Sequence, residues 1–315
     1  MALAALAAPP SVAGICKTLD LMPEYFVFAA KTAGMAPDAR AGLFANDFAS
    51  RHPEFYVPED FGGVDKIRKA AERFYDPGRQ LTLPGSTPLT DENLRAASRA
   101  AGPALADAEA QFAAMFPDFR CNAVVSMGMS LSRFDANAFT DSKGRDFVRL
   151  GIDMMARLHH PEDLPGVFSH MLFQIYFSQL HPEVGAADFD LIWQAMWVEG
   201  LGTYISRQMK PAAGEQKVLG MPDDLVAQME RPGMMAKAAA AMLVDAEKSD
   251  EATYAKWFAL DHPPDGLPPR AGYFMGLRMA EKLVRSHTLN QLAHLKPEEE
   301  RALAKAFLEE HETRR

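Results

Sequence analysis

Two apolar segments of the sequence each contain one residue that could do chemistry. His170 lies in the segment LPGVFSHMLFQIYF, and Glu199 lies 29 residues later in LIWQAMWVEGLGTYIS. Imidazole and carboxylate groups bind metals and transfer protons. Gln174 follows His170 by four residues, so a helix would place both side chains on one face. A single histidine in an apolar helix is more often a hydrogen-bonded core residue, so the surrounding sequence must decide between these interpretations.

The two segments together resemble the gluzincin-type predicted zinc-dependent peptidases. Members of that family carry H-E-x-x-H on one helix and a glutamate, within W-x-E-G-L, on the next. His170 matches the first metal ligand, Gln174 stands at the second, and Glu199, within Trp197-Val198-Glu199-Gly200-Leu201, matches the third. In the active family these three ligands hold zinc and leave one position open for water.

A further segment extends the resemblance toward the C-terminus. Residues 269–276, PRAGYFMG, resemble an R-x-G-Y-x-x-G helix start of the same family, which makes Arg270 and Tyr273 candidates for a substrate groove. A helix that begins after two prolines explains these residues equally well. The resemblance covers about residues 119–300 and implies a zincin-like fold, α+β and mostly helical.

Departures from the family motif decide the expected function. Met171 stands where the general-base glutamate belongs, and Gln174 replaces the second histidine. Methionine cannot accept a proton from water, and loss of a positioned acid–base group costs roughly 10²–10⁴ in rate. A neutral amide is a weak zinc ligand beside imidazole. The sequence therefore predicts weak or absent zinc, no other cofactor, and a pseudo-peptidase that binds a peptide or protein in its cleft.

Two alternatives remain open. The first is an active hydrolase with a rebuilt site, in which His159 or His160 folds back toward His170. His181 cannot serve, because eleven residues along a helix are about 16 Å. The second is an unrelated helical protein for binding or structure, in which the side chains of His170 and Glu199 point apart.

The elements expected to position these residues follow an α+β order. Helices broken by Pro and Gly predict a helical N-terminal region over residues 14–118. A zincin-like domain over residues 119–315 follows. Within it we expect strands at 119–127 and 146–155, helices at 164–180 and 189–209, and a helical C-terminal part over 211–315. In that last part the predicted helices lie near 222–229, 233–247, 250–258, 270–285 and 297–311.

Composition narrows the classes further. With 48% hydrophobic and 24% charged residues, the chain of 315 residues is typical of a folded globular protein. The net charge of −9 disfavours nucleic-acid binding, and no apolar run is long enough for a membrane span. Residues 1–13, MALAALAAPPSVA, are either the remnant of a secretion signal, which would mean a periplasmic protein, or an Ala-rich tail of a cytoplasmic one. The two cysteines, Cys16 and Cys121, are expected to be unpaired, although export would allow a disulfide.

Overall fold

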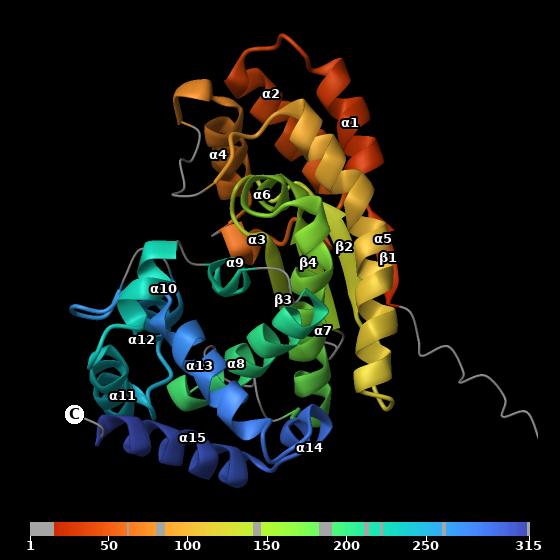
Figure 1. The fold of residues 1–315 in the computed structure, drawn as a ribbon. Coiled ribbons are helices and arrows are strands. Elements are labelled where there is room, and N and C mark those ends of the chain that lie inside the picture. The colour runs from red at the N-terminus through yellow and green to blue at the C-terminus, as the bar shows by residue number, and fades with distance from the viewer. Residues whose placement is uncertain are drawn as a thin grey trace, which may run out of the picture.

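The computed structural model describes residues 16–61, 63–79, 86–140, 146–182, 191–210, 214–220, 223–259 and 263–313 (Figure 1). The predicted signal remnant at 1–13 lies outside these residues. The fold is α+β and mostly helical, as the sequence predicts. Every helix in the described part of the chain is too short or too polar to span a lipid bilayer.

The elements follow one another along the chain with helices dominating both ends. The first half contains β1 (Lys17–Asp20), α1 (Met22–Lys31), α2 (Pro37–Leu43), η1 (Phe44–Phe48), η2 (Ala49–Arg51), α3 (Pro58–Phe61), α4 (Val64–Tyr75), η3 (Pro77–Arg79), α5 (Asp91–Met115), β2 (Val124–Gly128), β3 (Ala136–Thr140), β4 (Asp146–Gly151) and α6 (Ile152–Leu158). The second half contains η4 (Pro161–Asp163), α7 (Leu164–Leu180), α8 (Ile192–Met209), α9 (Glu215–Leu219), α10 (Asp223–Met229), α11 (Met234–Asp245), α12 (Glu251–Phe258), α13 (Ala271–Leu283), α14 (Leu289–Ala293) and α15 (Pro297–Glu312).

A four-stranded sheet lies in the middle of the molecule, with the strand order β1-β2-β4-β3. Strands β1, β2 and β4 run parallel, and β3 is the antiparallel edge strand. Helices α1, α2 and α4 lie at one end of the sheet, and α8 to α15 form a helical half at the other (Figure 1). The long helix α5 connects the two ends and packs against α6 and α7.

Two strands were not expected from the sequence. Only helices were predicted over residues 17–115, yet β1 pairs with β2, with Lys17 opposite Val124. The Gly-, Ser- and Asn-rich segment before residue 146 contains β3, whose Ala136 pairs with Leu150 of β4. Both strands are short, with four and five residues, so neither offers enough alternation of polar and apolar residues to indicate a strand.

The two predicted strands are confirmed only in part. The strand predicted at 119–127 begins at Val124, and the strand predicted at 146–155 ends at Gly151, where α6 begins. Asp153 lies in the first turn of α6, and its buried carboxylate accepts hydrogen bonds from the backbone amides of Ser130 (2.6 Å) and Ser132 (2.7 Å). By contrast, α7 spans the predicted range 164–180, and α8 ends at the predicted Met209.

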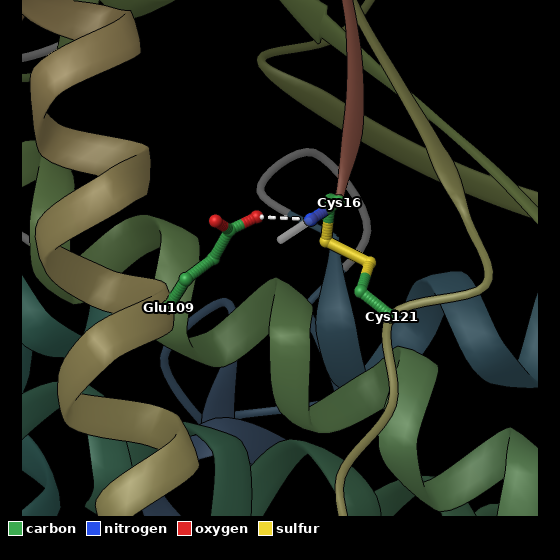
Figure 2. Close-up of side chains that lie close together, drawn as sticks. All are labelled: Cys16, Glu109 and Cys121. Carbon is green, nitrogen blue, oxygen red and sulfur yellow. Dashed lines mark hydrogen bonds between the residues drawn. A yellow bond between two sulfur atoms is a disulfide. The ribbon is translucent and has the colours of Figure 1, made fainter. Parts of the chain in front are cut away.

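Cys16 and Cys121 form a disulfide, so the expectation of two unpaired thiols is wrong (Figure 2). The pairing of β1 with β2 brings the residues before each strand together, and the two Cα atoms lie 4.9 Å apart. Glu109 of α5 lies beside the disulfide and accepts a hydrogen bond from the backbone amide of Cys16 at 3.0 Å. Burial raises the pKa of Glu109, and this hydrogen bond offsets part of that effect.

Helix α8 passes between α7 and α13 at very short range. A Cβ on Gly200 would lie 2.4 Å from the backbone of Gly276 in α13, closer than any real contact. On the other side, a Cβ on Gly202 would lie 2.9 Å from the imidazole ring of His170 in α7. A side chain at Gly200 would therefore force α8 and α13 apart, whereas one at Gly202 would displace the imidazole ring of His170.

The disulfide should contribute measurably to stability. Replacing both cysteines, Cys16→Ser and Cys121→Ser, is expected to lower the free energy of unfolding by about 2–5 kcal/mol, because the bridge closes a long loop in the unfolded chain. Urea denaturation measures the difference, and a reducing agent should shift the midpoint of the wild-type protein alone. Two reactive thiols in the native, non-reduced wild-type protein would contradict the pairing.

The contact between α8 and α13 gives a second prediction. Gly200→Ala should lower the free energy of unfolding by about 1–3 kcal/mol, because the added methyl group overlaps backbone atoms that cannot move aside. Gly102→Ala is the matched control, since Gly102 lies within helix α5 and has nothing within 4 Å of its ideal Cβ position. Equal effects of the two substitutions in urea denaturation would show that the helices have room to separate.

Candidate functional site

The structure brings together the residues that the sequence singled out on α7 and α8. His170 Nε2 lies 2.8 Å from Glu199 Oε2, and Gln174 Nε2 donates to Glu199 Oε1 at 3.1 Å. Because an ionised carboxylate only accepts, the imidazole N–H is the donor in the first contact. The unrelated-protein alternative required the side chains of His170 and Glu199 to point apart, and they do not.

Burial makes these hydrogen bonds important. Helix α8 is buried along nearly its whole length, and the Glu199 side chain is only 9% exposed. An ionised carboxylate at such a position is costly unless donors surround it. His170, Gln174 and, at the long distance of 3.5 Å, the hydroxyl of Tyr254 on α12 provide those donors. His170, Gln174 and Glu199, called the constellation below, therefore provide hydrogen-bond partners for one another.

The family's base position is closed to water. Met171, at that position, is 3% exposed and belongs to the hydrophobic core. Its thioether cannot take a proton from water, so Met171 cannot supply the general-base step that the resemblance would place at this position.

The donor set does not fit a resident zinc ion. Zinc in catalytic sites takes three protein ligands from His, Cys, Asp and Glu, whereas here only His170 and Glu199 are of these types and Gln174 presents its amide nitrogen to the carboxylate. In the described part of the chain, only Cys16, Glu109 and Cys121 bring three such ligand atoms within 4.8 Å of one another. Both of those sulfur atoms belong to the disulfide, so that cluster has no thiolate to offer.

The alternative of a rebuilt site named His159 and His160 as its candidates. His159 Nε2 pairs with Asp135 Oδ2 at 3.1 Å, and His160 is exposed. His181 contacts the carbonyl oxygen of Ala293 at 3.0 Å, in another part of the molecule.

Both groove candidates lie beside the constellation. The ring centre of Tyr273 is 6.4 Å from that of His170, and the guanidinium of Arg270 stacks 4.3 Å from the Tyr273 ring centre. Burial raises the pKa of the Tyr273 hydroxyl, and the negative charge of Glu199 raises it further. Arg270 caps α13 in a left-handed conformation, with φ of 60°. Gly220 leaves room for this side chain, because a Cβ at that position would lie 2.6 Å from Arg270 Nη1.

Asp135 and Tyr254 complete the surroundings of the site and were missed by sequence reasoning. Asp135 immediately precedes the edge strand β3, and its electrostatic interaction with Arg270 connects the His159 pair to the groove candidates. Partial burial alone would raise the pKa of Asp135. The hydrogen bond and charge of His159, together with Arg270, outweigh it and lower the pKa to about 2. No spacing in the sequence relates these residues to Glu199, so no signal could have found them.

The pKa of Asp135 predicts part of the acid sensitivity. A carboxyl with a folded pKa of about 2 and an ordinary value of 3.8 stabilises the protein above pH 4, and this contribution is lost as the pH falls from about 4 toward 2. The Asp135 side chain is 39% exposed, so the effect should stay under about 1 kcal/mol. Asp135→Asn should therefore destabilise the protein more at pH 6 than at pH 3 in urea denaturation.

The control for this measurement is Asp107→Asn, a substitution at an exposed position of α5. It should have the same small effect at both pH values. A destabilisation by Asp135→Asn that is independent of pH would contradict the role of the His159 pair.

No family model, no curated protein and no solved structure matches this chain, so its own geometry has to support any function assigned to it.

Proposed function

We propose that this chain is a gluzincin-like pseudo-peptidase: a zincin-like fold that has lost zinc-dependent proteolysis and binds a peptide or protein partner. One observation carries the proposal. The Glu199 carboxylate, at the position of a metal ligand, is instead satisfied by His170 and Gln174. The same three residues that would surround a zinc ion thus form a closed hydrogen-bonded group.

Strand β3 supports a peptide as the partner. It is the edge of the sheet, and among the described strands only β4 pairs with it. An extended peptide can add to such an edge through backbone hydrogen bonds. Asp135 immediately precedes β3, and α7, which carries His170, packs against this strand. A peptide on β3 would therefore pass close to Arg270 and Tyr273.

The disulfide supports export. Disulfides persist in oxidising compartments and are rare in the cytosol, so the Cys16–Cys121 bridge favours a periplasmic or otherwise extracytoplasmic location over a cytoplasmic one.

Counting bound metal by mass spectrometry tests the proposal. The wild-type protein, purified with excess zinc, should hold far less than one zinc ion per chain. It should also leave casein uncleaved in a protease assay. The double substitution Met171→Glu with Gln174→His restores the family ligands and should hold about one zinc ion per chain, which His170→Ala should then remove.

Two results would overturn the proposal in different ways. One zinc ion in the wild-type protein that disappears with His170→Ala would mean that the site is intact as a metal centre. Absence of zinc from the double variant as well would mean that the geometry is not that of a zincin, and the resemblance would fail.

A further inference from the structure

A second site lies away from His170 and Glu199, in a cavity of about 230 Å³. Its walls come from α4 and η3, from the segment before α5, from the loop between β2 and β3, and from the end of α6. Four of its eight lining residues are arginines: Arg73, Arg79, Arg133 and Arg157. Figure 1 shows α4 and α6 next to each other at the end of the sheet where α1 and α2 also lie.

The charge of this cavity contrasts with that of the chain. The protein has a net charge of −9, yet among the described residues none that lines the cavity is acidic. Asp76 pairs with Arg79 at 3.2 Å from outside the lining, but the arginine side chain is 69% exposed, and such surface pairs contribute little. The arginines therefore create a locally positive potential that attracts anions.

Arg157 gives the cavity a buried cationic wall. The residue is only 7% exposed, and its backbone is held in place because its carbonyl oxygen accepts hydrogen bonds from the amide (2.9 Å) and the hydroxyl (3.3 Å) of Thr87. A charge that is partly removed from water interacts more strongly with a bound anion than an exposed charge does.

The loop between β2 and β3 is held by hydrogen bonds to Asp153. Leu131 and Ser132 adopt left-handed backbone conformations, with φ of 57° and 62°. Such conformations are costly for these residue types. The buried carboxylate of Asp153 compensates by accepting the backbone amides of Ser130 and Ser132. The cavity is therefore formed by the protein itself and needs no ligand to assemble it.

The lining also indicates which chemical groups a bound anion should have. Phe74, Leu89 and Leu131 contribute apolar surface beside the arginines. Guanidinium groups bind carboxylates and phosphates through paired N–H donors. The volume matches about eight water molecules, which limits the ligand to a small compound.

We propose that this cavity binds a small organic dianion, in which a phosphate or dicarboxylate group meets the arginines and an apolar body meets Phe74, Leu89 and Leu131. This site is independent of the proposed pseudo-peptidase function.

Isothermal titration calorimetry on the full chain at pH 8 and low salt tests the proposal with phenyl phosphate and phthalate as probes. At least one of them should bind with a Kd below about 1 mM, whereas the neutral compound phenol should bind at least tenfold more weakly. Tighter binding of phenyl phosphate would identify the phosphate class, and tighter binding of phthalate the dicarboxylate class.

Substitutions at the mouth locate the site. Arg73→Gln with Arg79→Gln should weaken binding of the better probe at least tenfold, and both side chains are exposed, so the fold should persist. Arg99→Gln, at an exposed position of α5 outside the cavity, is the matched control and should leave the affinity unchanged. Failure of both probes to bind, or equal affinities of the double variant and the control, would overturn the proposal.

Discussion

The short distance between α8 and its two neighbours determines much of the helical half of the molecule. Protein interiors are close-packed, so a helix can approach a second backbone and an aromatic ring together only where it has no side chain in the way. Gly200 meets the backbone of Gly276, and Gly202 meets the ring of His170. Glu199 immediately precedes Gly200 in α8, and the close approach of the helices brings its carboxylate to His170 and Gln174 of α7.

That carboxylate then sets the chemistry of its surroundings. A buried negative charge needs either a cation or several hydrogen-bond donors. Here His170 and Gln174 provide the donors. Met171 and Gln174 both suit a site without a metal. The Gln174 amide can donate to the carboxylate directly, and the Met171 thioether can be buried without a hydrogen-bond partner.

The parts of the structure that sequence could predict are those with local causes. Helices α7 and α13 are long helical segments with prolines at or before their first turns, and they lie where the sequence places them. The proximity of His170 to Glu199 was also expected, through resemblance to a known helix pair. What could not be predicted depends on distant contacts. Strand β1 exists because β2 lies beside it. Asp135 reaches the site because β3 is paired with β4. Asp153, just after the end of β4, holds backbone amides that lie more than twenty residues earlier.

The parallel pairing of β1 with β2 also has a consequence for the order of events during synthesis. Lys17 is among the first described residues to leave the ribosome, but its partner Val124 follows only after about a hundred more residues. At bacterial or eukaryotic elongation rates this interval is on the order of ten seconds. During that time helices α2, α3 and α4 can form and pack, because their contacts are with one another and with η1. Until β2 is synthesised, the backbone groups of β1 can form hydrogen bonds only with water. The central sheet is therefore completed after the first N-terminal helices have formed.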